Sequence, residues 1–329
     1  MICYIAIIEG FAMSLLSQKH LQNEEDAYKW VEARIWPNGA QCPHCFEQKR
    51  VSKMEGKATR FGLYKCYACR KQFRVTVGTI FEKSHVPLYL WLQAFYLIAG
   101  SKKGISANQL HRTLGVTLKT AWFMGHRIRE AMRIGSLTHP MGGEGKVVEA
   151  DETFYGRTST HPKGRKTKFD KAMHKNVIFA LVERGGSVRS YHVSGATVAE
   201  VIPIINANVK RETAMMTDSA KLYKFQLSQF ASHDRIYHGK KEYVRYVPEG
   251  PTIHSNTVEN YFSVFKRGMR GTYQHCKEKH LHRYLAEFDF RYNNRVALGI
   301  DDETRASKMI KGAQGRRLTY RKAGSARAE

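Results

Sequence analysis

The chain has 329 residues, of which 54 are Lys or Arg and 29 are Asp or Glu, giving a formal net charge of +25 at pH 7. The length predicts about two domains. A hydrophobic fraction of 42%, with 11% aromatic residues, excludes a wholly disordered chain. This charge is far outside the range of ordinary metabolic enzymes and indicates a polyanionic partner, most often nucleic acid.

The N-terminal region lacks the features of a membrane anchor or a secretion signal. Its apolar stretch, residues 2–8, is far shorter than the ~20 residues of a spanning helix. No basic region precedes it and no clear cleavage site follows. We therefore expect no membrane partner, and we interpret residues 1–12 as an extension or a disordered arm. Periodicity predicts an amphipathic helix over residues 14–36, ended by Pro37, so that residues 1–39 form an arm and a helix.

Four of the six cysteines form two C-x-x-C pairs, which are separated by twenty residues. They are Cys42, Cys45, Cys66 and Cys69. Two such knuckles supply the four thiolates that tetrahedral structural zinc prefers. The alternative is redox-active pairs, for which one pair suffices. With short strands expected at 60–65 and 72–77, residues 40–82 are predicted to be a zinc-binding unit.

Three helical patterns follow in residues 83–134. They cover 88–99, 106–114 and 118–132, and a break at 115–117 separates the last two. Two helices joined by a short turn with a glycine are typical of a helix-turn-helix. The alternative is a plain helical hairpin. If the region reads DNA, the candidate contacts are Lys119, Arg127 and Arg129.

A Gly- and Pro-containing linker, residues 134–145, leads into a region of mixed elements. Strands are expected at 146–154, 176–183, 187–193, 213–217 and 242–247. Helices are expected at 197–208, 225–232, 256–268 and 280–294. Residues 146–295 are therefore predicted to form an α/β domain. Residues 296–329 are predicted to be a basic tail, with eight basic residues and one acid from Arg305 onward.

Acidic side chains stand at the ends of two apolar strands of this α/β region. Asp151 stands at the middle or end of the first strand, Asp218 stands at the end of a later one, and Glu259 lies on the helix at 256–268. Burying such acids is expensive without a cation, and carboxylates suit Mg²⁺. Two such ions can activate a nucleophile and stabilise the leaving oxygen of a phosphodiester. The alternative is that the acids cap turns or pair with Lys and Arg.

Two further side chains share the helical face of Glu259. Lys266 lies two turns after it and is suited to hold a phosphate, and Asn256 lies three residues before it. A second basic feature is the run at 157–175, which has seven Lys or Arg and one acid. This loop is placed to clamp a phosphate backbone, although a solvated hairpin is the alternative. The candidate DNA contacts here and on the helix are Lys163, Arg165, Lys166 and Arg267.

Taken together, these motifs resemble the zinc-ribbon DDE transposases of bacterial insertion sequences, a group related to Merlin DNA transposons. The resemblance covers residues 15–295 and rests on CPHC, CYAC, VVEADETFYG, TDSAKLY, HSNTVENYFSVFKRGMRGTY and HLHRYLAEFDFRYNNR. It implies a multidomain α+β chain with a zinc ribbon, a helix-turn-helix-like region at 83–134 and a C-terminal ribonuclease-H-like α/β catalytic domain. Asp151 and Asp218 match the two family aspartates. Glu259 fits the third position of the metal-binding triad, with Asn256 as the second choice.

The resemblance also implies a function. A DNA transposase would bind the terminal inverted repeats of its element, cleave the ends and join the 3′-OH to target DNA by two-metal transesterification. Its cofactors would be structural Zn²⁺ and two catalytic Mg²⁺, with Mn²⁺ as a substitute, and no nucleotide cofactor. We expect double-stranded DNA as partner, a homo-oligomer on that DNA and a nucleoid-associated place in the bacterial cytoplasm. The alternatives are a ribonuclease-H-like nuclease or resolvase, and a zinc-dependent DNA-binding regulator.

Overall fold

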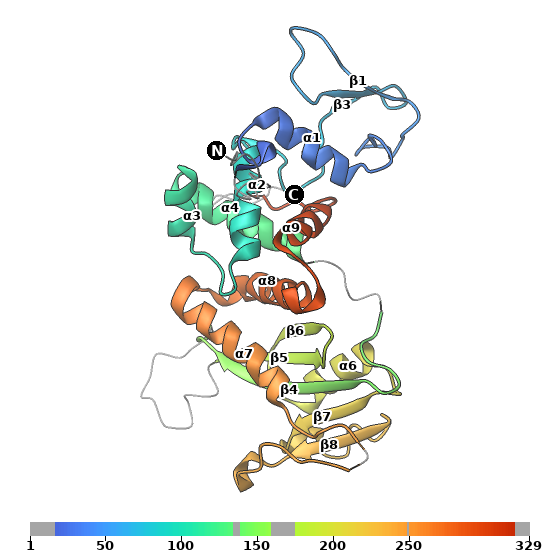
Figure 1. Ribbon diagram of the computed structural model, residues 1–329, viewed down its shortest axis with the longest axis vertical. Coiled ribbons are helices and arrows are strands. Elements are labelled where there is room, and N and C mark those ends of the chain that lie inside the picture. Colours follow the sequence, from blue (N-terminus) through green and yellow to red (C-terminus); the bar gives the residue numbers. More distant parts are fainter. Residues whose placement is uncertain (1–16, 134–138, 159–174, 249, 320–329) are drawn as a thin grey trace, which may run out of the picture. The chain divides into compact units, whose positions relative to one another are not determined.

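The structure is a computed structural model that describes residues 17–133, 139–158, 175–248 and 250–319. The chain divides into two compact units (Figure 1). The first comprises residues 1–100, 107–131 and 302–329, and the second comprises residues 101–106 and 132–301. No helix in the described ranges is long and apolar enough to cross a membrane.

The first unit begins with a short turn of 3₁₀ helix, η2 (Lys19–Leu21), and helix α1 (Glu24–Ile35). Asn23 caps α1, because its Oδ1 accepts hydrogen bonds from the backbone N–H groups of Glu25 and Asp26. The expectation of a helix from residue 14 is thus wrong for residues 17–23, and residues 14–16 lie outside the described ranges. The helix ends at Ile35, before Pro37, as expected.

A three-stranded antiparallel sheet follows α1. Its strands pair in the order β1 (Val51–Lys53), β2 (Tyr64–Cys66) and β3 (Gln72–Phe73). The strands are shorter than predicted, and β1 was not predicted. A small core of Cys42, Cys66 and Phe73 holds the sheet, with Trp36 and Tyr64 packed against it. So small a core is typical of a domain that depends on a metal ion for stability.

Four helices complete the first unit. They are α2 (Leu88–Gly100), α3 (Ala107–Leu114), α4 (Leu118–Met132) and α9 (Asp302–Lys311). The first three match the predicted ranges to within one residue. Thr117 caps α4, because its Oγ1 accepts from the N–H of Thr120. Helix α9 belongs to the segment predicted as a basic tail, but it packs against α1 and α2.

The second unit is built on a five-stranded sheet. Its strands are β4 (Val147–Tyr155), β5 (Asn176–Glu183), β6 (Val188–Val193), β7 (Ala214–Asp218) and β8 (Ser232–Ile236). The spatial order is β6-β5-β4-β7-β8. Strands β4, β5 and β6 pair antiparallel, whereas β7 and β8 run parallel to β4. This order and these directions are those of a ribonuclease-H-like sheet, which confirms the expected fold class.

Helices cover both faces of this sheet (Figure 1). The side chains of β5 alternate between the faces, as a strand requires. Phe179 and Leu181 join the core beneath α6 (Val198–Asn208). Ile178 and Ala180 join the core beneath α7 (Asn256–Gly268) and α8 (Leu281–Asn293). Short helical turns fill the connections: η4 (Lys221–Tyr223), η5 (His238–Lys240), η6 (Met269–Tyr273), η7 (Glu278–His280) and η8 (Val296–Leu298).

The sequence prediction fails at two places between β7 and α7. Residues 225–231 form no helix, and β8 begins at Ser232 instead. Residues 242–247 form no extended strand and make only an isolated bridge between Arg245 and Ile253. Strand β8 pairs on one side only and reads SHDRI, so it lacks the apolar alternation by which strands are recognised.

Candidate active site and metal centre

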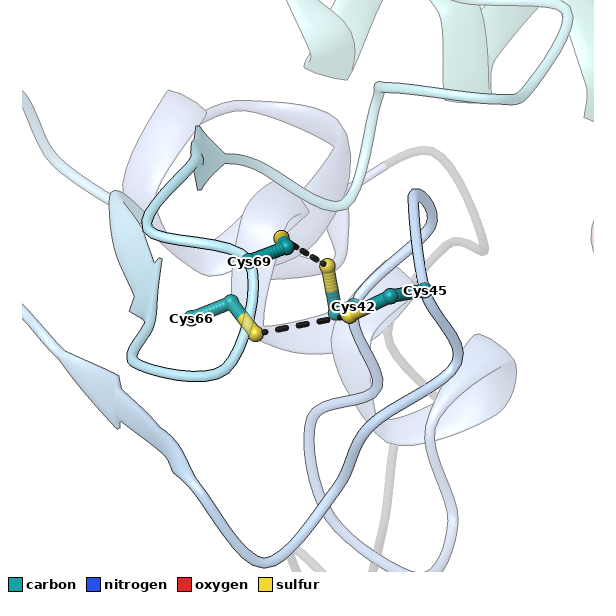
Figure 2. Close-up of side chains that lie close together, drawn as sticks. All are labelled: Cys42, Cys45, Cys66 and Cys69. Carbon is teal, nitrogen blue, oxygen red and sulfur yellow. Dashed lines mark hydrogen bonds between the residues drawn. The ribbon is translucent and has the colours of Figure 1, made fainter.

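The four cysteines of the two C-x-x-C pairs converge on one point (Figure 2). The Sγ atoms of Cys42 and Cys69 are 3.6 Å apart, as are those of Cys45 and Cys66. A tetrahedral zinc ion with bonds of about 2.3 Å requires sulfur–sulfur distances of about 3.8 Å. All four sulfurs lie within 4.8 Å of one another. The donor set therefore fits closed, structural zinc, as the sequence predicted.

The local backbone explains this convergence. Phe46 and Arg70, each directly after the second cysteine of a pair, both adopt a left-handed φ of 60°. This conformation turns each knuckle back on itself. Backbone N–H groups of Cys69 and Ala68 lower the pKa of the Cys66 thiol to about 7. These backbone groups thus favour the thiolate form of Cys66, which is the form that binds zinc.

Asp151 and Asp218 lie at matching positions on neighbouring strands. Strands β4 and β7 run parallel, and their last paired residues are Ala150 and Thr217. The next residue on each strand is one of the two aspartates. Burial, followed by the charges of Glu152, Asp218 and Glu259, raises the pKa of Asp151 to about 8. The structure thus brings the three predicted acids into one electrostatic neighbourhood.

Sequence reasoning missed a fourth acid at this place. Glu152 is half-buried, and burial raises its pKa, with the charge of Asp218 acting in the same direction. Its Oε2 accepts a hydrogen bond of 2.5 Å from the hydroxyl of Tyr223, a fully buried residue of η4. Glu152 stands beside Asp151 in the sequence, and that adjacency was the available signal.

Glu259 reaches the site from α7. Its Oε1 accepts a hydrogen bond of 3.0 Å from Ser255 Oγ and lies 3.2 Å from His238 Nε2. The side chain is 47% exposed. Asn256, the alternative third ligand, is exposed at the first residue of the same helix.

Lys266 is half-buried on α7, within the electrostatic reach of Asp151. Burial and the charge of Arg270 lower the pKa of Lys266, while Asp151 opposes that change. A cation beside the acids is what the sequence predicted for this position. The donor set of the acids consists of carboxylate oxygens, which fits Mg²⁺. Among the described residues, the four cysteines are the one set of three or more potential ligands within 4.8 Å of one another, so the carboxylates are more widely spaced.

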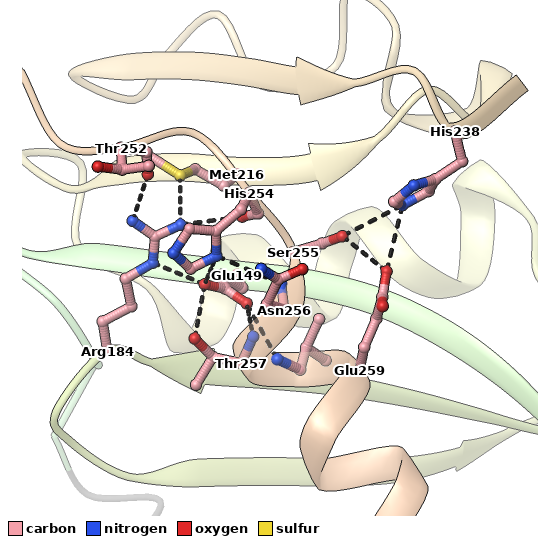
Figure 3. A network of polar contacts seen from close by, with 11 residues as sticks. Glu149, Arg184, Met216, His238, Thr252, His254, Ser255, Asn256, Thr257 and Glu259 are labelled. Carbon is pink, nitrogen blue, oxygen red and sulfur yellow. Dashed lines mark hydrogen bonds and ion pairs between the residues drawn. The ribbon is translucent and has the colours of Figure 1, made fainter. Parts of the chain in front are cut away.

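A buried ionic network, which sequence reasoning also missed, fixes the start of α7 (Figure 3). Glu149 has no exposed surface. Its Oε2 accepts from the N–H groups of Thr257 and Val258, and its Oε1 accepts from Thr257 Oγ1. Arg184 Nε donates to the same Oε1 at 2.6 Å. Glu149 thereby caps α7 from another element, because Ser255 directs its own hydroxyl to Glu259.

The same guanidinium links two more segments to Glu149, namely the stretch before α7 and strand β7. Arg184 donates to the carbonyls of Thr252 and His254 and to Met216 Sδ on β7. Glu149 and Asp151 are two residues apart on β4, so their side chains leave the same face of the strand. The cap therefore sets the position of α7 over the strand that carries Asp151.

Two of the predicted DNA contacts require correction. Arg127 is 6% exposed, and its guanidinium donates to the carbonyls of Ile80, Glu82 and Leu318. Arg129 is 4% exposed. Arg127 therefore faces the interior of the first unit, and neither arginine has the exposed surface that a DNA contact requires.

The other predicted DNA contacts have different outcomes. Lys119 on α4 and Arg267 on α7 are exposed, as a DNA contact requires. The loop candidates lie outside the described residues: Lys163, Arg165 and Lys166.

Comparison with known proteins identifies the class of this chain. Residues 142–293 match the family model of the ISXO2-like transposase domain. Residues 22–72 match the model of the transposase zinc-ribbon domain. The chain therefore belongs to the zinc-ribbon DDE transposases of insertion sequences. It is a transposase, and its transposase domains indicate DNA as the partner.

One curated relative is an uncharacterized protein in transposable element ISH50 of Halobacterium salinarum. It is 27% identical over 271 residues, which are 78% of this chain and 86% of the relative. A solved chain in the simian T-cell lymphotropic virus intasome in complex with PP2A regulatory subunit B56 gamma is 13% identical, with a TM-score of 0.27. That match covers 55% of this chain and 63% of the solved one.

Zinc content tests the metal centre. We expect one equivalent of zinc in the purified chain, and its loss in the Cys66→Ser variant, because a closed tetrahedral site needs all four thiolates. The ribbon should then unfold, since metal binding supplies its folding free energy. Elemental analysis and limited proteolysis measure the two effects. Cys276→Ser is the matched control and should keep the zinc. A full zinc content in Cys66→Ser would contradict the assignment.

Replacing the buried cap tests the network around α7. Glu149→Gln should destabilise the second unit by about 3 kcal/mol, because it leaves the Arg184 charge without its carboxylate. Calorimetry of the full chain measures the unfolding transition of that unit and hence the change in its free energy of unfolding. Glu212→Gln, at an exposed position of the same unit, should shift it by less than about 0.5 kcal/mol. Equal shifts in the two variants would show that the ion pair does not hold α7.

Helix α4 offers a test of the correction to Arg127. Arg127→Met should lower the melting temperature, because three carbonyls lose a charged donor at a cost of about 3 kcal/mol. Lys119→Ala should leave the melting temperature unchanged and weaken DNA binding, with the salt dependence reduced by about one counterion. A stable Arg127→Met variant with weakened DNA binding would restore the arginine as a DNA contact.

Proposed function

We propose that this transposase cleaves the ends of its insertion sequence and joins them to target DNA at the carboxylate site of the second unit. The observation that carries the proposal is the parallel pairing of β4 and β7, which places Asp151 and Asp218 at matching positions on neighbouring strands. Burial and the neighbouring carboxylates raise the pKa of Asp151 to about 8, so these acids repel one another when ionised, and a bound cation would relieve that repulsion. In a DDE transposase, the chemistry that follows is phosphodiester transfer.

The residues have distinct roles in this proposal. Asp151, Asp218 and Glu259 hold two Mg²⁺, with Mn²⁺ as a substitute. When bound, the ions lower the pKa of the attacking hydroxyl and neutralise the leaving oxygen. Lys266, beside Asp151, contacts a phosphate of the cleaved strand. Asn256 is the alternative third ligand, since it occupies the first residue of the same helix.

The reaction has two steps at the same carboxylates. Water first attacks the phosphodiester at the element end, so a P–O bond breaks and a 3′-OH is released. That 3′-oxygen then attacks a phosphodiester of the target, and one P–O bond forms as another breaks. The number of phosphodiester bonds is conserved in the second step, so no nucleotide cofactor is needed.

DNA recognition belongs to the first unit in this proposal. The zinc ribbon and helices α3 and α4 bind the terminal inverted repeats, with Lys119 on α4 at the DNA. Arg267 and the loop residues Lys163, Arg165 and Lys166 contact the backbone near the carboxylates. Because two ends are joined, the chain acts as a homo-oligomer on double-stranded DNA, on chromosomal DNA in the cytoplasm.

A strand-transfer assay with labelled element ends, a plasmid target and Mg²⁺ tests this function. Wild type should yield joined product, and Asp218→Asn should reduce cutting and joining at least about a hundredfold, because a metal-ligating charge supplies several kcal/mol to the transition state. Glu212→Gln is the matched control and should react like wild type. In the same assay, Glu259→Gln should fail and Asn256→Ala should react, which assigns the third ligand.

Other outcomes separate the alternatives. Cutting without joining would identify a nuclease or resolvase. Specific end binding with no reaction in any variant would identify a DNA-binding regulator. Normal joining by Asp218→Asn would place the chemistry elsewhere in the chain.

A further inference from the structure

The segment between β8 and α7 carries large side chains that no core covers. We call residues 237–248 and 250–253 the aromatic loop. Tyr243 is 60% exposed and Tyr246 is 82% exposed, and the neighbouring Val247 is 41% exposed. Tyrosines more often place their apolar ring against protein and only their hydroxyl in water. Two rings left in solvent on one loop are therefore candidates for contact with a partner.

The loop holds these rings outward through contacts of its own. Arg245 and Ile253 exchange two backbone hydrogen bonds of 2.9 Å. The Arg245 side chain donates to Glu242 at 2.8 Å and to the carbonyl of Arg235 at 3.0 Å. Glu242 in turn accepts from the N–H of Tyr237 at 3.1 Å. Tyr243 and Tyr246 thus lie on either side of Arg245, whose backbone and side chain are held by these hydrogen bonds. Less conformational entropy of the loop is therefore lost when a partner binds.

The aromatic loop adjoins the carboxylate site. The ring of Tyr243 lies 5.7 Å from the ring of His238, and His238 Nε2 lies 3.2 Å from Glu259 Oε1. A strand of DNA whose phosphodiester reaches the carboxylates can therefore place its neighbouring nucleotides on this loop.

The charge of the loop agrees with a nucleic acid partner. Lys240 and Lys241 are exposed. Lys240 Nζ lies 5.5 Å and Arg235 Cζ 5.8 Å from the centre of the Tyr237 ring. Alternating cations and aromatic rings match a phosphate backbone and the faces of bases. An apolar protein partner would gain nothing from the cations.

We propose that Tyr243 and Tyr246 form a stacking surface for unpaired nucleotides beside the scissile phosphodiester. In an intact duplex each base face is covered by its neighbours, so a ring can stack only on a base that has left the helix. The surface therefore recognises the opened strand next to the cleavage point. The location of these nucleotides rests on the proposed function, but the stacking itself is measured without catalysis.

Binding and cross-linking by the full-length, zinc-containing chain test this surface in the absence of added Mg²⁺. The probes are a short oligothymidylate carrying 5-iododeoxyuridine and a duplex of equal length. Tyr243→Ala and Tyr246→Ala should each weaken binding to the single strand about tenfold and leave duplex binding nearly unchanged. Photo-cross-links should map to the two tyrosines. Tyr246→Phe keeps the ring and should bind like wild type.

Charge variants separate stacking from electrostatics. Lys240→Ala should weaken binding to both probes and reduce the salt dependence of the binding constant. Tyr246→Ala should leave that salt dependence unchanged. Three outcomes overturn the proposal: equal losses on both probes, cross-links confined to other residues, or a changed sedimentation coefficient of Tyr246→Ala, which would assign the rings to a protein contact. Asp218→Asn should keep the cross-links, so a failure of the proposed catalysis is distinguishable from a failure of stacking.

Discussion

A carboxylate with no exposed surface determines where helix α7 begins. Glu149 accepts from two backbone N–H groups and a hydroxyl at that helix terminus, and it pairs with Arg184. Such a group is stable inside a protein only when every partner is in place, because the desolvation penalty of an unpaired charge is several kcal/mol. The network therefore admits one position of α7 relative to β4, and Glu259 on α7 takes its position from it.

Successive side chains of β4 point to opposite faces of the sheet, so its three acids make different contacts. Glu149 and Asp151 face α7, whereas Glu152 points to the opposite face and meets Tyr223. One face thus carries both the residue that fixes the helix and the residue at the candidate site. If the pairing of β4 with β5 or β7 shifted by one residue, the Glu149 side chain would point to the opposite face of the sheet. The N–H groups at the start of α7 would then lose their acceptor. The register of the sheet and the geometry of the site therefore depend on the same contact.

What the sequence predicted follows from local signals, and what it missed depends on distant partners. The cysteine spacing alone defined the metal centre, and the long apolar run of β5 and the amphipathic face of α7 defined those elements to the residue. The partners of Glu149 lie 35 and 108 residues away, and no local pattern encodes them. Strand β8 is polar because its edge is open, so it carries no periodicity. The start of α1 was predictable, since Asn23 precedes three acids that suit a helix N-terminus.

The basic residues show how composition and surface differ. Five arginines of the described ranges are buried: Arg127, Arg129, Arg189, Arg291 and Arg305. No lysine of those ranges is buried. A planar guanidinium can satisfy several carbonyls at once, whereas an ammonium is strongly hydrated and stays in water. Part of the charge of +25 thus holds the fold together, and the field that attracts DNA arises mainly from lysines and exposed arginines. Inner arginines such as Arg127 and Arg189 bind carbonyl and amide oxygens within the fold, and the outer lysines are the groups whose counterions DNA would displace.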